Sequence, residues 1–308
     1  MRSALMGACW ISPTTVGIVA DSRTAHLVTH RREPWKPQPG ASLEERIAGL
    51  WTSGQDDALS YPESGNDACF QIEDRSFWFK HRNSCISAVV GRMTPDGLFV
   101  DVGGGNGFVA KGLTEAGLDV ALVEPGLAGA RHAWQRGVRP VICATLERAG
   151  FPEQSLGGIG IFDVLEHIED DVAFLRNMRR HLKPTGRLYI TVPAFQFLWS
   201  AEDTAAGHFR RYSRSTLRAV LERAEFEVEY LSGMFAWLPL PVFLRRSLPS
   251  RLGRRDASAS RADAVHMLPE SRFGRALDRL LTREREHISR GGSLMIGGSL
   301  IAVARPTP

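Results

Sequence analysis

The sequence predicts an α/β protein whose parallel sheet carries helices on both faces. From residue 98 onward, apolar segments of strand length alternate with segments that have the apolar period of a helix. The first strand, 98–102, runs into a turn rich in glycine. Acidic residues stand at the carboxyl ends of three predicted strands: Asp101, Glu124 and Asp163. Because ligands of parallel sheets bind at this edge, we expect the three carboxylates around one crevice.

The composition is typical of a globular protein. The 308 residues, 43% hydrophobic and 23% charged with a net charge of +4, allow one elaborated domain or two smaller ones. The four cysteines lack C-x-x-C spacing, so we expect core residues and no metal. No apolar run is long enough to span a bilayer, and Pro13 interrupts a weakly signal-like start. A cytoplasmic location is therefore expected.

Residues 1–68 are predicted to form a partly irregular N-terminal extension. Prolines and glycines interrupt its periodicity, and its clearest element is a short helix over Ser42–Trp51, capped by Ser42.

A longer helix is predicted after Ser76, and one of its faces holds Trp78, Arg82, Cys85 and Val89. An arginine on an apolar face needs an anionic partner, because an unpaired buried charge is costly. That partner is either an acidic side chain, in a structural salt bridge, or the carboxylate of a ligand above the glycine turn.

The alternating elements then follow in order. Strands are predicted at 98–102, 119–123, 140–143, 158–162, 187–192, 226–231 and 294–303. Helices are predicted at 107–117, 127–136, 170–182 and 215–224. Pro184 and Gly186 should end the third helix before the fifth strand begins. An insert of about 60 residues separates the last two strands.

The glycine turn admits two cofactors. Residues 105–110 fit G-x-G-x-x-A, with Glu124 placed to bind a ribose, which is the pattern of a nicotinamide-dependent oxidoreductase. The turn also fits D-x-G-x-G-x-G, beginning at Asp101. An acid directly before the glycines repels a pyrophosphate but suits an ammonium, and Arg82 offers a charge for a carboxylate. An amino-acid head joined to a ribose describes S-adenosylmethionine, which we favour.

Five segments in order resemble the class I S-adenosylmethionine-dependent methyltransferases, over about 70–232 and 291–305. The resemblance is to a bacterial branch with an aromatic-W-F-x-x-R helix before the glycine motif. The segments are Phe77-Trp78-Phe79-Lys80-His81-Arg82, Val100 through Gly107, Val123-Glu124, Phe162 through Ile168, and Leu182 through Leu188.

The resemblance implies a Rossmann-like, seven-stranded, mostly parallel sheet in the order 3-2-1-4-5-7-6, with a helical insert between the last two strands. The methyltransferase domain would comprise 69–232 and 291–308, and the insert 233–290. The methyl donor S-adenosyl-L-methionine would leave as S-adenosyl-L-homocysteine, and no metal is expected.

The same resemblance assigns the cofactor contacts. Gly103, Gly105 and Gly107 would pack under the methionine and ribose, and Glu124 would bind the ribose hydroxyls. Asp163 would lie near the amine and Arg82 would bind the carboxylate, with Trp78 and Asp101 completing the site. Relatives often carry an acid after the third strand to contact the adenine. This sequence has Thr145 and Leu146 there, so Thr145 or a backbone group must substitute.

The segment after the fifth strand supplies candidates for methyl transfer to a hydroxyl, or less readily to an amine or carboxylate, of a small molecule, glycan or peptide. His208 is the candidate general base because imidazole titrates near neutral pH. His167 is the second, unless it caps the helix that begins near Asp170. Trp199, Arg211 and Tyr212 are candidate substrate contacts. Alternatively, Trp199 belongs to the core or a lid, and Arg211 and Tyr212 cap the next helix.

The insert at 233–290 is the most basic part of the chain. Residues 245–290 hold 12 arginines, no lysine and six acidic residues. An apolar face over 270–288 predicts a helix, which either caps the sheet or forms a lid that meets an anionic membrane surface. No nucleic-acid-binding motif is present, so no nucleic-acid partner is expected. A cofactor-binding partner protein without turnover remains the non-enzyme alternative, and the oligomeric state is not predicted.

Overall fold

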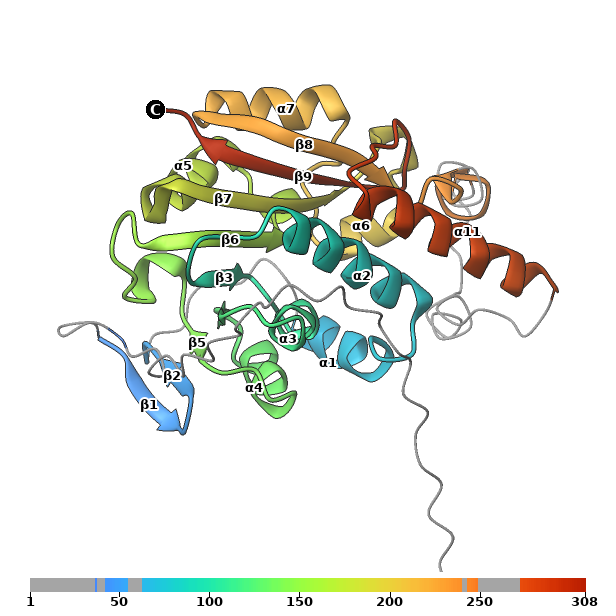
Figure 1. Cartoon of the computed structure of the whole chain (residues 1–308). Coiled ribbons are helices and arrows are strands. Elements are labelled where there is room, and N and C mark those ends of the chain that lie inside the picture. The colour runs from blue at the N-terminus through green and yellow to red at the C-terminus, as the bar shows by residue number, and fades with distance from the viewer. Residues whose placement is uncertain (1–36, 38–41, 55–62, 240–242, 249–271) are drawn as a thin grey trace, which may run out of the picture. The chain divides into compact units, whose positions relative to one another are not determined.

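A computed structural model describes residues 37, 42–54, 63–239, 243–248 and 272–308. All of them lie in the compact unit Trp35–Pro308. The predicted α/β class is confirmed, because helices and strands alternate along most of this unit (Figure 1).

The sheet has nine strands rather than the expected seven. Their order is β1-β2-β5-β4-β3-β6-β7-β9-β8. Strands β3 to β9, numbered one to seven along the chain, stand in the order 3-2-1-4-5-7-6, and β1 and β2 extend the edge beyond β5. β9 runs antiparallel to both β7 and β8. The strands are β1 (Glu44–Ile47), β2 (Leu50–Thr52), β3 (Phe99–Val102), β4 (Val120–Val123), β5 (Val141–Cys143), β6 (Leu156–Phe162), β7 (Leu182–Pro193), β8 (Phe226–Met234) and β9 (Ser299–Pro306).

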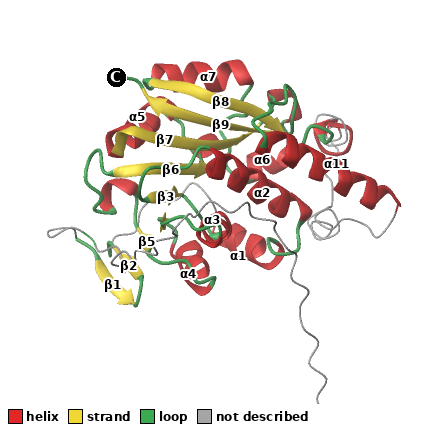
Figure 2. Ribbon diagram, in the orientation of Figure 1, coloured by secondary structure: helices red, strands yellow, loops and turns green. Residues whose placement is uncertain are grey.

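Helices cover both faces of the sheet (Figure 2). They are α1 (Glu63–Ile72), α2 (Phe77–Arg92), α3 (Phe108–Glu115), α4 (Leu127–Gln135), α5 (Asp171–His181), α6 (Ala201–Ala205), α7 (Arg214–Arg223) and α11 (Arg272–Ser289). Single turns of helix lie at Leu146–Arg148, Leu165–His167, Gln196–Leu198 and Phe243–Ser247.

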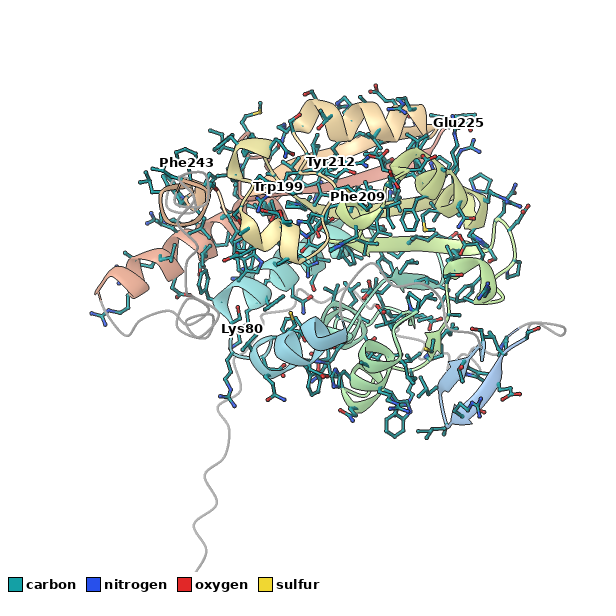
Figure 3. The ribbon with its side chains drawn as sticks, turned by 180° about the vertical axis from the view of Figure 1, so that it is seen from behind. Lys80, Trp199, Phe209, Tyr212, Glu225 and Phe243 are labelled. Atoms are coloured by element: carbon teal, nitrogen blue, oxygen red, sulfur yellow. The ribbon has the colours of Figure 1, made fainter. Side chains whose placement is uncertain are left out.

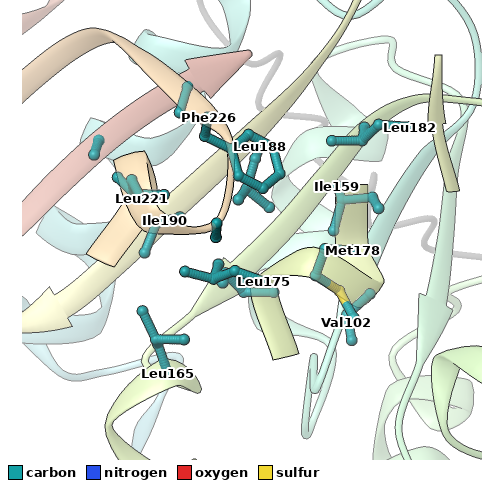
Figure 4. Close-up of a cluster of buried hydrophobic side chains, with 14 of the residues drawn as sticks. Val102, Ile159, Leu165, Leu175, Met178, Leu182, Leu188, Ile190, Leu221 and Phe226 are labelled. Carbon is teal, nitrogen blue, oxygen red and sulfur yellow. The ribbon is translucent and has the colours of Figure 1, made fainter. Parts of the chain in front are cut away.

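Two hydrophobic cores form because successive strand side chains point to opposite faces. In β4, Ala121 and Val123 join the core under α5 and α7, while Val120 and Leu122 join the core under α2 and α3. Figure 4 shows the first core, where Leu175 and Met178 of α5 meet strand side chains such as Ile159 and Leu188. The central strands are thus buried on both sides and present their carboxyl ends as the accessible edge.

The predicted helix over Ser42–Trp51 is wrong. Residues 44–52 form a β-hairpin, β1 and β2, whose turn includes Gly49 at a φ of +81°. Its second strand pairs in parallel with β5, Leu50 opposite Val141. Pairing with a strand about 90 residues away overrides the local helical signal, because strand formation depends on neighbours in space.

Two other strand boundaries differ from the prediction. β7 begins at Leu182 instead of Arg187 and includes the segment expected as a turn, since Leu182 pairs with Leu156 of β6 before a register shift. The last strand begins at Ser299 instead of Leu294. The residues just before this strand form hydrogen bonds outside the regular strand pairing; for example, the Gly233 N–H donates to Leu294 O.

The helix predicted at 270–288 in the insert is confirmed as α11, which lies along α2 (Figure 1). Leu281 and Ile288 of α11 are buried in the core that α2 also joins. None of the described helices is both long and apolar enough to cross a bilayer. Much of the predicted basic patch, 249–271, lies outside the described residues.

Candidate active site

The glycine turn links β3 to α3 in a conformation that favours glycine. Gly103, Gly105 and Gly107 have φ values of +67°, +51° and +74°, in the left-handed region. A Cβ on Gly103 would lie 2.8 Å from Val164 Cγ2, and one on Gly107 would lie 2.7 Å from Ala133 Cβ. α3 begins after Gly107, which offers no side chain to cap its first turn. Its backbone N–H groups therefore lie at the edge of the sheet where a polar ligand could bind.

Glu124 is held rigidly at the end of β4. Its Oε2 accepts from the Gly105 N–H at 2.8 Å and its Oε1 from the Gly126 N–H at 2.7 Å. Burial raises the pKa of this carboxyl, and the two backbone hydrogen bonds oppose that rise. Each oxygen retains a second lone pair, so the group can also accept from a pair of ribose hydroxyls.

Asp101 lies at the end of β3 and is 1% exposed. Burial raises its pKa to about 7, even though the nearby Arg82 lowers it. Its Oδ2 has no hydrogen-bond partner among the described residues. An ammonium group would supply both the donor and the charge that this buried oxygen lacks, so the turn fits the head of S-adenosylmethionine better than it fits a pyrophosphate.

Arg82 has the anionic partner that its position predicts. Its Nε lies 2.7 Å from Asp163 Oδ2, and the Thr191 hydroxyl donates to Asp163 Oδ1 at 2.9 Å. Asp163 itself has a φ of +58°, which is rare for a residue with a Cβ and concentrates at functional sites. The salt bridge leaves guanidinium N–H groups of Arg82 available for a second anion.

The remaining predicted cofactor residues are Trp78, Thr145 and Leu146. The ring of Trp78, half-buried at the start of α2, stacks on that of Phe235 with a centroid distance of 3.8 Å. Thr145 precedes the turn after β5 and is partly exposed, whereas the Leu146 side chain is buried in the core.

His167 and His208 come together at the same sheet edge, and with Glu166 they form what we name the edge cluster. The Phe209 N–H donates to Glu166 O at 2.8 Å, which joins the segment after β6 to the segment after α6. The two imidazole rings meet edge to face at 4.6 Å. The alternative that His167 caps α5 is wrong, because the capping side chain is that of Asp170.

The edge cluster is held in a defined electrostatic state. Burial alone would raise the pKa of Asp203, but hydrogen bonds from His208 and Arg211 lower it to about 2. Asp203 is therefore ionised, and its Oδ1 lies 2.9 Å from His208 Nδ1. This favours the tautomer in which Nδ1 carries the proton and Nε2 has a free lone pair.

The other two residues of the edge cluster have shifted pKa values. The pKa of His167 is lowered to about 4, mainly by burial and secondly by the neighbouring His208. Burial, followed by Asp163, raises the pKa of Glu166 well above its usual value.

Two of the three predicted substrate contacts, Trp199 and Tyr212, lie in the same region of the molecule (Figure 3). Tyr212 is 1% exposed and its hydroxyl donates to Asp171 at 2.9 Å. Arg211 donates to both carboxylate oxygens of Asp203, at 2.8 and 3.0 Å. These two side chains therefore support the loop, and their polar groups are already engaged. Trp199 lines a hollow of about 440 Å³ together with residues of α6.

Sequence reasoning assigned no role to two carboxylates, Asp203 and Glu284. Asp203 forms a capping box with Ser200, an S-x-x-D pattern visible in the sequence. Glu284 lies on the buried stripe of α11, three residues after Leu281 and four before Ile288, so its spacing could have revealed it. With His81 and Cys85 of α2 it forms a second group, which we name the insert cluster.

Comparisons with known proteins point to one class of enzyme. Residues 80–231 match a family model described as a methyltransferase domain. A probable S-adenosylmethionine-dependent methyltransferase of Mycolicibacterium smegmatis is 25% identical over 185 residues, covering 58% of this chain and 72% of the relative. One from Mycobacterium tuberculosis is 24% identical over 167 residues, covering 53% of this chain and 61% of the relative.

Solved structures show the same fold. A phosphoethanolamine N-methyltransferase 2 of Haemonchus contortus, bound to S-adenosylhomocysteine and phosphomonomethylethanolamine, superposes with a TM-score of 0.50 at 17% identity. The match covers 81% of this chain and 58% of that chain. The fold, the domain match and the sequence relatives together identify a class of enzyme. The protein is an S-adenosylmethionine-dependent methyltransferase.

Proposed function

We propose that this enzyme transfers the methyl group of S-adenosyl-L-methionine to a hydroxyl of a small-molecule, glycan or peptide acceptor bound beside the edge cluster. The observation that carries the hydroxyl assignment is the Asp203–His208 pair. An imidazole with a free Nε2, fixed by an ionised carboxylate, is suited to take a proton from an oxygen acid.

The cofactor is proposed to occupy the glycine turn. Asp101 and Asp163 would hold the methionine ammonium, Arg82 its carboxylate, and Glu124 the ribose hydroxyls, with Trp78 beside the methionine. Thr145 or a backbone group after β5 would contact the adenine. When bound, the cofactor supplies an electrophilic methyl carbon on a sulfonium.

The residues of the chain then act on the acceptor. His208 Nε2 would accept the proton of the acceptor hydroxyl as its oxygen takes the methyl group, and the cofactor would leave as S-adenosyl-L-homocysteine. Asp203 stabilises the imidazolium that results. His167, whose low pKa keeps its ring neutral near pH 7, adds no positive charge that would oppose this protonation. Trp199 is the remaining candidate for contact with the body of the acceptor.

Calorimetry tests the cofactor assignment. We expect S-adenosylhomocysteine to bind and NADH not to bind, because the acidic turn repels a pyrophosphate. Glu124→Gln should weaken S-adenosylhomocysteine binding by about 10- to 100-fold, as for a hydrogen bond to a charged group. Glu115→Gln, an equivalent change on the exposed surface of α3, should leave it unchanged. NADH binding without S-adenosylhomocysteine binding would instead make the chain an oxidoreductase.

Transfer of a labelled methyl group tests turnover. The protein is incubated with labelled cofactor and cell extract, and the labelled product is identified. An O-methylated product supports the proposal, whereas an N-methylated product overturns the hydroxyl assignment. Tight cofactor binding with no labelled product from extract would favour the non-enzyme partner protein.

A further inference from the structure

The edge cluster has the composition and spacing of a metal site. Glu166, His167 and His208 each offer one ligand atom, and the three atoms lie within 4.8 Å of one another. Two imidazole nitrogens and one carboxylate form a donor set that divalent transition metals bind in proteins. Among the described residues, only the insert cluster is a comparable group.

Glu166 provides a second, independent observation. The residue is 1% exposed, and its Oε2 has no hydrogen-bond partner in the described part of the chain. A buried carboxylate oxygen without a donor is costly, and native proteins seldom keep one without an ion or a water. A cation between Glu166 and the two imidazoles would satisfy this oxygen.

His208 also has the outer contact that metal-binding histidines usually make. Metal ligands of this type donate their other ring N–H to a carboxylate, which fixes the ring and directs the free nitrogen at the ion. Asp203 provides that carboxylate at 2.9 Å. Asp203 is fixed in turn by Arg211 and by the Ser200 N–H, which donates to it at 2.8 Å.

The insert cluster lacks these features although its residue types are similar. Glu284 Oε1 accepts from His81 Nε2 at 2.8 Å and from the Phe235 N–H at 2.5 Å, and its Oε2 accepts from the Ala236 N–H at 2.8 Å. Its carboxylate already has three protein donors. An ion there would have to displace them, so this cluster is not a candidate.

We infer that Glu166, His167 and His208 bind a divalent transition-metal ion of the zinc type. Three protein ligands leave a fourth position open, as in zinc sites that carry out chemistry. The occupant of that position rests on the proposed function: it would be a water or the acceptor oxygen. A cation lowers the pKa of an oxygen acid bound to it, so the loaded protein would not need His208 as a base. The inference revises the expectation of no metal.

Cobalt(II) is the probe, because its d–d absorption reports ligation directly. Metal-free full-length protein titrated with Co²⁺ should bind one equivalent, and Zn²⁺ should displace it. Glu166→Gln should weaken Co²⁺ binding at least about 100-fold, since loss of even an outer-shell partner costs about 10- to 100-fold. Glu169→Gln, the same change on an exposed neighbouring residue, should have no effect.

Two further measurements locate the ion. His208→Asn should lower the Co²⁺ affinity and alter the d–d spectrum, with S-adenosylhomocysteine affinity as the control for folding. A sulfur-to-cobalt charge-transfer band that disappears in Cys85→Ser would place the ion in the insert cluster and overturn the inference. Co²⁺ binding unchanged in both edge-cluster variants would also overturn it.

The metal inference and the proposed function can fail separately. Methyl transfer to a hydroxyl by protein that binds no Co²⁺ or Zn²⁺ would leave the function standing with His208 as the base, and would overturn the inference. Co²⁺ bound through Glu166 and His208 without any methyl transfer would support the inference and overturn the function.

Discussion

The edge cluster and the insert cluster both combine histidine with a glutamate, yet their polar atoms are used differently. In the insert cluster, the Glu284 carboxylate accepts three hydrogen bonds from His81, Phe235 and Ala236. In the edge cluster, one Glu166 oxygen has no partner among the residues that the structure describes, and His208 bonds Asp203 through Nδ1 and not through Nε2. Residue type alone thus does not separate a structural group from a chemical one. The two kinds of group are distinguished by whether their hydrogen-bond donors and acceptors are already paired with each other.

The largest expected effect belongs to the insert cluster. Glu284→Ala removes the acceptor of three buried donors, so we expect a loss of about 3–5 kcal/mol in the free energy of unfolding. Chemical denaturation monitored by circular dichroism measures it. Glu286→Ala, on the exposed side of the same helix, should change stability by less than about 0.5 kcal/mol. A similar loss in both variants would show that the cluster does not determine the result.

The next largest effect concerns the edge cluster. Without added metal, His208→Gln should lower the rate constant of the methyl-transfer step about 100-fold or more, because a positioned general base contributes at least that much. The melting temperature should change far less than in Glu284→Ala. Single-turnover assays with labelled cofactor measure the rate. If His208→Gln unfolds the protein and leaves the rate of the folded fraction intact, the two clusters share a structural role.

The smallest effect is the dependence of stability on pH. The folded pKa of His167 is about 4, below the ordinary value of 6.5, so the unfolded chain binds a proton that the folded chain does not. This group therefore contributes full stability above pH 6.5, and the contribution falls as the pH drops towards 4. His167→Gln should lose less stability than the wild type between pH 7 and pH 4.5. Denaturant titrations at the two pH values measure the loss of unfolding free energy in each protein. An equal loss in the wild type and in His167→Gln would contradict this prediction.

The central strands and the glycine turn could be predicted because their signals are local. An apolar run, an acid and closely spaced glycines determine the course of Leu98–Gly107 without reference to the rest of the chain. The hairpin at residues 44–52 could not be predicted in this way. Its second strand depends on pairing with β5, and that contact is absent from the local sequence.

The residues of the candidate site also divide into those that local sequence signals predict and those that they do not. Glu124 and Asp163 follow strands, so the topology alone brings them to one edge, and the period of α2 was enough to require an anion near Arg82. The partnership of His208 with Asp203 depends on the path of the loop after β7. Glu284 meets His81 across 203 positions of sequence. Such pairings follow from the assembled fold and have no periodic signature.

The contact between Glu284 and the backbone of Phe235 has a consequence for engineering. Phe235 stacks on Trp78, so one wall of the proposed cofactor pocket is fixed by a side chain from the far end of the insert. The insert is therefore not an exchangeable module. A chimera that takes its insert from another enzyme, in order to change acceptor selectivity, should retain cofactor affinity only if the donor sequence supplies a carboxylate at the position of Glu284.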